Sequence, residues 1–207
     1  IACSESWLEP VYNAMREMLR RQSVLHADES VLQVLHEPGK TAQSNSYMWL
    51  YRTGGDAAMP MVLYDYQPDR KAKRPLEFLQ GFSGYLHTDG YAGYHSLPDN
   101  ITVVGCWEHA RRKFDEALKA VPEKDRESSG AQRAKRYCDK LFDIERQLAK
   151  CTAAERVEKR QELAKPVLDE FLLYLQSAKA APKSGFGRAV HYTVEQWKYL
   201  ERYLLDG

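Results

Sequence analysis

The stretch Gly84-Tyr85-Leu86-His87-Thr88-Asp89-Gly90 has the pattern of a short apolar strand that ends at a carboxylate and a glycine turn. A second stretch, Ser23-Val24-Leu25-His26-Ala27-Asp28, has the same pattern. A carboxylate that directly follows an apolar strand lies where the chain leaves the core of a sheet. Asp28 and Asp89 are therefore the first candidates for a functional site.

Three further runs rich in β-branched and aromatic residues predict strands. They span residues 47–52, 61–66 and 101–106. Gly54-Gly55 indicates a hairpin-like connection between the first two. Helical spacing of apolar residues predicts a helix near residues 8–20, and Pro75 begins a shorter helix that runs through Phe82. This order predicts an α/β protein with the RNase H-like fold, a mixed five-stranded sheet flanked by helices, although periodicity alone does not determine the pairing.

The chain is predicted to be helical from Trp107 onward, so a long helical insertion follows the fifth strand. Thr152 and Glu155 have the spacing of a capping box, and Pro166 is expected to kink or split the helix in which it lies.

The last part of the chain is predicted to hold a loop and a final helix. Residues 180–187 are rich in Pro, Ser and Gly, which is typical of a loop. The helix is expected from about Val194, with Thr193 and Gln196 as its capping box.

These elements predict four segments. They are a lead-in helix at 1–22, an RNase H-like core at 23–119, a helical insertion at 120–187 and a return helix at 188–207. The insertion is dense in charged residues, which is typical of a solvated helix face. A surface that grips DNA or a second subunit is the alternative.

Composition favours an ordinary globular protein. Of 207 residues, 43% are hydrophobic and 29% are charged, and neither a long apolar run nor a signal-peptide pattern occurs, so we expect no membrane partner and a cytoplasmic location. Cys3, Cys106, Cys138 and Cys151 are scattered, which favours reduced thiols. The net charge of +1 does not by itself indicate nucleic acid, so DNA binding has to be argued locally.

Two strand-end aspartates suit a metal site. Hard cations such as Mg²⁺ choose carboxylate oxygens, and paired ions can stabilise the attacking and leaving oxygens of phosphoryl transfer. Most strand-end aspartates are turn or cap residues, however, so Asp28 and Asp89 alone leave both readings open.

Three motifs in succession bear on whether the two aspartates form a metal site. They are Leu25-His26-Ala27-Asp28-Glu29, Thr88-Asp89-Gly90-Tyr91-Ala92-Gly93-Tyr94, and Gly105-Cys106-Trp107-Glu108-His109-Ala110-Arg111-Arg112-Lys113-Phe114. In sequence, order and spacing they resemble successive signatures of the insertion-sequence-66 family of bacterial transposases. The resemblance covers nearly the whole chain.

The resemblance implies a DDE-type nucleotidyl transferase on an RNase H-like fold. In such an enzyme two aspartates and a glutamate hold two Mg²⁺ or Mn²⁺ ions, and Asp28 and Asp89 match the aspartates. The family's glutamate lies in a segment that would follow Asp206-Gly207. Because the chain begins at Ile1 and stops there, we expect it to be part of a longer protein. DNA, as transposon ends and target, is the implied partner, and self-association stays open.

Other carboxylates are weaker candidates for the third ligand. Glu108 could reach the site from the start of its helix, and Glu116 lies further along the same helix. The resemblance gives neither of them a catalytic role. Glu29 is expected to point to the opposite side of the strand from Asp28.

The motif Cys106-x-x-His109 resembles a signature of several DDE transposase families. A structural zinc site needs four ligands, and no second Cys or His pair has suitable spacing, so we expect Cys106 and His109 to support the active site instead. Contact of His109 with a phosphate or base of DNA is the alternative.

Two basic runs are candidate DNA contacts. Arg111-Arg112-Lys113 follows His109 by about half a helical turn and offers three cations for phosphates, with a solvated face as the alternative. Arg70-Lys71-Ala72-Lys73-Arg74 lies in a loop and predicts either a contact with the DNA backbone or a solubilising linker.

Two classes of function remain open. The first is a transposase core that cuts a DNA strand and joins the freed 3′ hydroxyl to a target. The second is an inactive or domesticated module that keeps the fold and its DNA-binding or partner-binding surfaces. A third, another RNase H-like nuclease, is disfavoured by the motif from Cys106 to Phe114.

Overall fold

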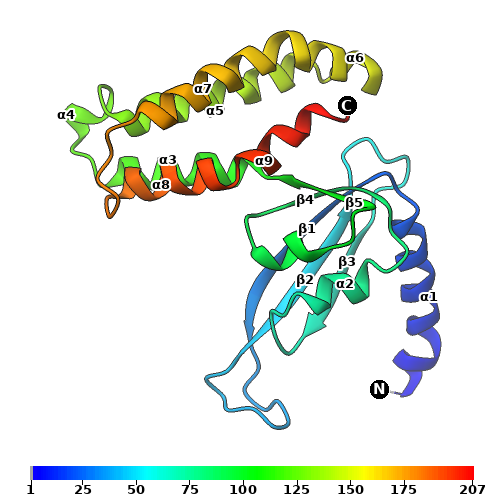
Figure 1. Cartoon of the computed structure of the whole chain (residues 1–207). Coiled ribbons are helices and arrows are strands. Elements are labelled where there is room, and N and C mark those ends of the chain that lie inside the picture. The colour runs from blue at the N-terminus through cyan, green and yellow to red at the C-terminus, as the bar shows by residue number, and fades with distance from the viewer. Residues whose placement is uncertain (1) are drawn as a thin grey trace. The chain divides into compact units, whose positions relative to one another are not determined.

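The computed structural model describes residues 2–207, with side chains described from residue 5. The chain forms two compact units, which meet in sequence between Val103 and Val104. We call the first the sheet unit and the second the helical unit (Figure 1).

A five-stranded mixed sheet organises the sheet unit. Its strands are β1 (Val24–Gln33), β2 (Asn45–Thr53), β3 (Val62–Gln67), β4 (Gly84–Thr88) and β5 (Ile101–Gly105), in the order β3-β2-β1-β4-β5. β1 pairs antiparallel with β2, and β2 pairs antiparallel with β3. β1 pairs parallel with β4 on its other side. The predicted α/β class and mixed five-stranded sheet are confirmed.

One face of this sheet forms the core of the unit. Alternation along the strands buries Leu25 and Ala27 of β1, Tyr51 of β2 and Leu86 of β4. Short elements cover them: α2 (Lys73–Phe78) and the 3₁₀ turn η1 (Ala92–Ser96). The Phe78 ring stacks on Tyr51 with centroids 3.7 Å apart.

Helix α1 (Ala2–Arg20) is attached to the end of α2 by arginine side chains. Arg20 donates from Nε to the Phe78 carbonyl at 2.8 Å, and Arg16 donates from Nη2 to the Glu77 carbonyl at 2.8 Å. The last carbonyls of a helix have no partner within the helix, and cations are favourable there. The arginines therefore satisfy the end of α2 while they hold α1 in place.

The prediction that the first strand ends at Asp28 is wrong. β1 continues to Gln33, because residues 29–33 keep pairing with β2, as far as Gln33 opposite Asn45. The polar residues after Asp28 resemble a strand end in sequence, but a hairpin partner supplies their backbone hydrogen bonds. Asp28 therefore lies inside a strand, near the level at which β4 stops.

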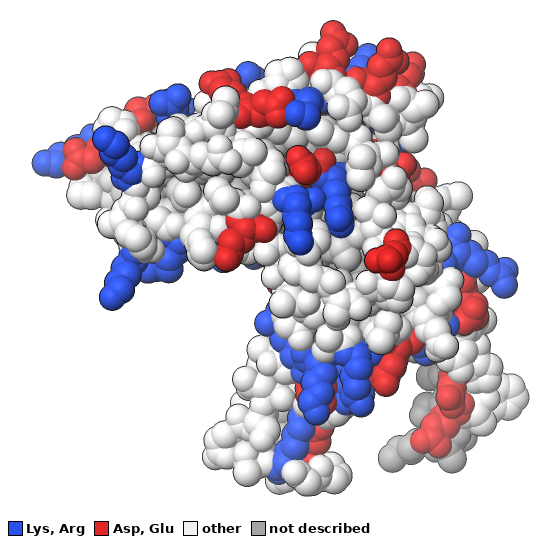
Figure 2. All heavy atoms as spheres, in the orientation of Figure 1, with Lys and Arg blue, Asp and Glu red and all other residues white. Residues whose placement is uncertain are grey.

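Helices make up the helical unit. They are α3 (Trp107–Lys119), α4 (Glu123–Arg126), α5 (Gly130–Gln147), α6 (Ala153–Lys159), the π turn η2 (Arg160–Ala164), α7 (Lys165–Ser177), α8 (Gly185–Glu195), α9 (Trp197–Leu200) and the 3₁₀ turn η3 (Glu201–Leu204). α3 packs on α5 and α8, and α5 packs on α7 (Figure 1). Figure 2 shows acidic and basic side chains mixed around α4 and α6. Among the described residues, no helix combines the length and apolarity that crossing a membrane needs.

Helix boundaries in this unit confirm two local predictions and correct a third. The capping box of Thr152 and Glu155 is present, and Pro166 lies in the first turn of α7, directly after the π turn that separates α7 from α6. The predicted cap at Thr193 is wrong. α8 begins at Gly185 under a cap by Ser184, and Thr193 is buried inside the helix, where its hydroxyl donates to the Ala189 carbonyl at 2.8 Å.

An aromatic cluster forms the core of the helical unit. Phe171 of α7 is fully buried and stacks on Tyr137 of α5, with centroids 4.8 Å apart. The rings of Trp107, Phe114 and Trp197 lie within 6.1 Å of the Phe171 centroid. Helices from several parts of the chain therefore meet at one side chain.

Phe171→Ala should lower the free energy of unfolding by about 3–5 kcal/mol, because it removes a buried ring and leaves a cavity. Leu173→Ala is the matched control, since Leu173 lies on the same helix with 67% of its surface exposed, and it should change stability by no more than about 0.5 kcal/mol. Chemical denaturation of both variants provides the measurement. Equal losses for the two variants would mean that the helices do not pack around Phe171.

Candidate functional site

The parallel register of β1 and β4 brings Asp28 and Asp89 to one level of the sheet. Val24 pairs with Tyr85, and the pairing continues as far as His26 opposite His87. Two more residues in the same register put Asp28 opposite Asp89, which directly follows β4. Neighbouring strands lie about 4.8 Å apart. Because Asp89 lies after the end of β4, its own contacts and not strand alternation place its side chain.

His26 and His87 lie two residues before Asp28 and Asp89 in the sequence, and His26 is on the same face of β1 as Asp28. The rings of His26 and His87 stack with centroids 4.8 Å apart. Burial lowers the pKa of His26 to about 3, and His87 and Arg52 contribute in the same direction. His26 is therefore neutral at physiological pH, and the paired positions of β1 and β4 on this face are in side-chain contact.

Local hydrogen bonds orient both aspartates. Asp89 Oδ1 accepts from the backbone N–H of Tyr91 at 2.9 Å, which is an Asx turn, and its side chain is 22% exposed. Asp28 Oδ1 accepts from the backbone N–H of Glu29 at 2.9 Å, and Asp28 is exposed. Both carboxylates are accessible to solvent.

Glu29 lies on the opposite, buried face, as strand alternation predicts. Its side chain is only 1% exposed. Oε2 accepts from the Tyr94 hydroxyl at 2.7 Å, and Oε1 accepts from Arg70 Nε at 2.6 Å. Burial raises the pKa of Glu29 above its ordinary value, although these hydrogen bonds act against the shift. Glu29 is therefore committed to the core of the unit and does not share the face of Asp28.

The two aspartates match a hard divalent cation in donor chemistry. Carboxylate oxygens are the ligands that Mg²⁺ prefers, and Mg²⁺ keeps water at its remaining positions. No group of three or more His, Cys, Asp or Glu that could hold a metal ion occurs among the described residues. That Asp28 and Asp89 supply two of the three carboxylates that the family resemblance implies stays a prediction.

Comparison with known proteins assigns the family. The sequence profile described as the Transposase IS66 family matches residues 1–207. The chain belongs to the IS66 transposase family. It is similar to two proteins of Sinorhizobium fredii (strain NBRC 101917 / NGR234): the uncharacterized protein y4qI, 30% identical, and the uncharacterized protein y4hP, 29% identical. Each match covers 97% of this chain and 39% of the relative, so the chain spans about two fifths of their length. No solved structure matches.

The third motif of this IS66-family chain forms the start of α3. Cys106 is the residue that precedes the helix, and His109 lies in its first turn. Burial acts to raise the pKa of the Cys106 thiol, but the hydrogen bonds and charge of His109 outweigh burial, so the pKa lies below its ordinary value. Cys106, Cys138 and Cys151 are free thiols, and the side chain of Cys3 lies outside the described residues. The support of Asp89 by Cys106 and His109 stays a prediction.

Arg111, Arg112 and Lys113 of α3, the predicted DNA contacts, differ in the contacts that their side chains make within the helical unit. Arg111 Nε lies 2.5 Å from Oδ1 of Asp139 on α5. Lys113 Nζ lies 4.4 Å from the ring centroid of Tyr192 on α8. Arg112 is exposed. Of the three cations, Arg112 is therefore the most available to an external anion, and a DNA contact by any of them stays a prediction.

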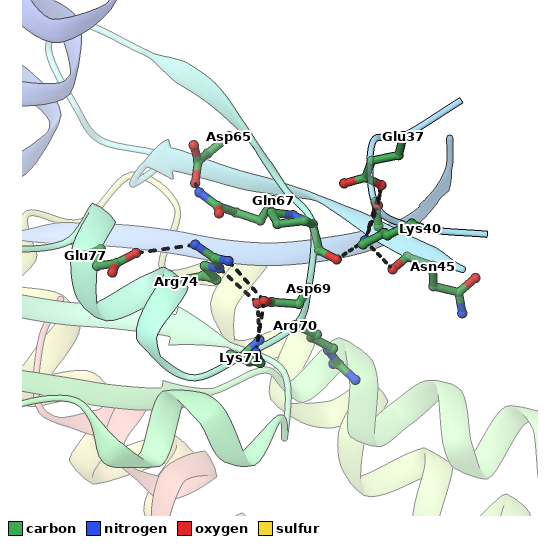
Figure 3. Close-up of polar contacts among 12 residues, drawn as sticks. Glu37, Lys40, Asn45, Asp65, Gln67, Asp69, Arg70, Lys71, Arg74 and Glu77 are labelled. Atoms are coloured by element: carbon green, nitrogen blue, oxygen red, sulfur yellow. Dashed lines mark hydrogen bonds and ion pairs between the residues drawn. The ribbon is translucent and has the colours of Figure 1, made fainter. Parts of the chain in front are cut away.

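The second basic run of the IS66-family chain was predicted to lie in a loop, but Lys73 and Arg74 form the start of α2. Arg74 forms a bidentate pair with Asp69, at 2.9 and 3.0 Å, and Lys71 lies 3.5 Å from the same carboxylate. Figure 3 shows these side chains converging on Asp69 while Arg70 points away from them. Arg70 instead contacts Glu29, 41 residues earlier in the chain. The basic pattern of residues 70–74 predicted a DNA contact or a linker but did not distinguish Arg70 from its neighbours.

The thiol of Cys106 should react with iodoacetamide at lower pH than an ordinary cysteine, whose pKa is about 8.5. A lowered pKa means that thiolate is already present below that pH. His109→Ala should shift the pH midpoint of the reaction upward. Cys138 is the internal control, because burial raises its pKa to about 12 and it should stay unmodified in the folded protein. Mass spectrometry of each cysteine across a pH series measures this, and an unchanged midpoint in His109→Ala would contradict it.

Proposed function

We propose that this chain is the catalytic core of an IS66-family transposase, which cuts DNA at transposon ends and joins the freed strand to a target by a DDE mechanism. The observation that carries the proposal is the register of β1 and β4, which brings Asp28 and Asp89 to one level on adjacent central strands. An RNase H-like fold is part of the proposal. The strand order β3-β2-β1-β4-β5 supports it, with β3, β2 and β1 antiparallel to one another and β4 parallel to β1.

In this proposal Asp28 and Asp89 hold two Mg²⁺ or Mn²⁺ ions together with a glutamate from a segment that follows Asp206-Gly207 in the family. Bound ions of this kind stabilise the attacking and leaving oxygens of phosphoryl transfer. The residues of this chain supply the rest. The hydrogen bond from the Tyr91 N–H orients the Asp89 carboxylate. The pairing of β1 with β4 sets the position of Asp28 along the sheet.

DNA is the proposed partner, with Arg111, Arg112 and Lys113 as phosphate contacts. The proposed organisation keeps a core at 23–119, an insertion at 120–187 and a return helix at 188–207. Self-association and a cytoplasmic location at bacterial DNA belong to the same proposal. An inactive module with this fold would bind DNA without metal-dependent cleavage.

Asp28→Asn and Asp89→Asn should each lower Mn²⁺ affinity and reduce DNA cleavage by roughly 100-fold or more, because an amide is a much poorer ligand for a hard cation than a carboxylate. Asp99→Asn is the matched control, since it makes the same change at an exposed loop position. Mn²⁺ affinity is measured on the 207-residue chain by calorimetry. Cleavage is measured on a longer protein that contains the expected glutamate.

Two results would contradict this assignment. Cleavage by either variant at the rate of Asp99→Asn would remove Asp28 or Asp89 from the metal site. DNA binding without any metal-dependent cleavage by the longer protein would identify an inactive module.

Arg112→Ala should weaken binding to two unrelated DNA duplexes alike and reduce the slope of log affinity against log salt by about 0.9, as expected for one lost phosphate contact. Arg111→Ala should have a smaller effect, because Asp139 already pairs with that guanidinium. Lys150→Ala, which removes an exposed charge elsewhere in the helical unit, is the control. An effect of Arg112→Ala on only one duplex would indicate base reading instead, and an unchanged slope would indicate a solvated face.

A further inference from the structure

Arg70 is a cation that several contacts hold beside Asp89. Its Nε donates to Glu29 Oε1 at 2.6 Å, and Nη2 pairs with the same oxygen. Nη2 also lies 3.6 Å from Asp89 Oδ2. The guanidinium lies over the Tyr91 ring, 4.0 Å from its centroid, and the Tyr91 hydroxyl donates to the Arg70 carbonyl. These contacts hold both the guanidinium and the backbone carbonyl of Arg70 in place.

The partner that holds Arg70 is buried, but Arg70 itself is not. The Glu29 side chain is 1% exposed, whereas the Arg70 side chain is 39% exposed. The bonds to Glu29 use the edge of the guanidinium formed by Nε and Nη2. Among the described residues, no contact of Nη1 is found. Nη1 of a fixed and partly exposed arginine therefore remains available to a ligand.

A ligand that binds the Nη1 side of Arg70 has to be an anion. Guanidinium groups present their N–H donors in a planar fork that suits phosphate oxygens. A DNA strand that approaches Asp28 and Asp89 brings negative charge toward two carboxylates. A cation held 3.6 Å from Asp89 offsets part of that repulsion.

We propose that Arg70 binds a phosphate of the DNA strand at the Asp28–Asp89 site, with Glu29 and Tyr91 as its positioning residues. The assignment rests on the proposed function in that the ligand is a DNA strand at these aspartates. It goes further by giving a role to one cation of the loop before α2. Lys71 of the same loop and Arg74 in the first turn of α2 are held by Asp69 and have no such role.

The test compares two substitutions that remove the same charge from the same segment. Arg70→Gln removes the fixed cation, and Lys73→Gln removes an exposed cation three residues later. Binding of the 207-residue chain to a fluorescent duplex is titrated over a range of salt concentrations. Arg70→Gln should weaken binding roughly tenfold at low salt and reduce the salt slope by about 0.9, whereas Lys73→Gln should change the slope much less.

Arg70→Lys separates a phosphate contact from a purely structural role. Lysine keeps the charge but loses the fork and the stacking on Tyr91, so it should restore the salt slope while recovering only part of the affinity. Thermal unfolding of each variant checks that the sheet unit is intact. Equal slopes for Arg70→Gln and Lys73→Gln, or a slope that Arg70→Lys does not restore, would overturn the assignment.

Failure of this assignment is distinguishable from failure of the proposed function. If the slope depends on Arg70 but Asp28→Asn and Asp89→Asn cleave DNA normally, the DDE proposal fails and Arg70 remains a phosphate ligand. If the aspartate variants lose cleavage while Arg70→Gln behaves as Lys73→Gln does, only the role of Arg70 is overturned. A wild-type chain that binds no DNA would overturn the role of Arg70, whereas cleavage by the longer protein decides the proposed function.

Discussion

The parallel pairing of β1 with β4 determines where the candidate site residues lie. A slip of one residue between these strands would move Asp28 and Asp89 to different levels of the sheet. The register is held by the core, because Leu25 and Leu86 are paired and both fully buried. Hydrophobic packing of the core thus sets the level at which the backbone of Asp28 and that of Asp89 lie, without any direct contact between the two residues.

The alternation of side chains along β1 explains the contacts of Arg70. Because Asp28 faces solvent, its neighbour Glu29 must point into the core, and an unpaired buried carboxylate is costly. Tyr94 and Arg70 remove that cost by hydrogen bonding. Arg70 lies in the loop before α2. Its bond to the buried carboxylate of Glu29 therefore also places this loop beside Asp89. The position of the cation is therefore a consequence of the core as well as a property of the site.

Sequence alone predicted the features that depend on local pattern. The strands, the cap at Thr152 and the break at Pro166 follow from alternation, capping chemistry and the missing N–H of proline. Features that depend on partners distant in sequence were missed. β1 extends past Asp28 because β2 pairs with it, and Thr193 lies within a helix because its hydroxyl finds the Ala189 carbonyl. The candidate aspartates were identified by their motifs, whereas Arg70 is recognised only once the fold joins it to Glu29.

A DNA-binding role for a chain with net charge +1 has to depend on a few well-placed cations. Several basic side chains of the helical unit are already paired with carboxylates, Arg111 with Asp139 and Arg160 with Glu145 among them. A phosphate that displaces such a carboxylate gains little, because one anion only replaces another. Arg70 differs, since its bond to Glu29 uses Nε and Nη2, its side chain is 39% exposed, and no contact of Nη1 is found among the described residues. It can keep the buried partner and bind a phosphate together, so the fold does not have to open for the contact to form.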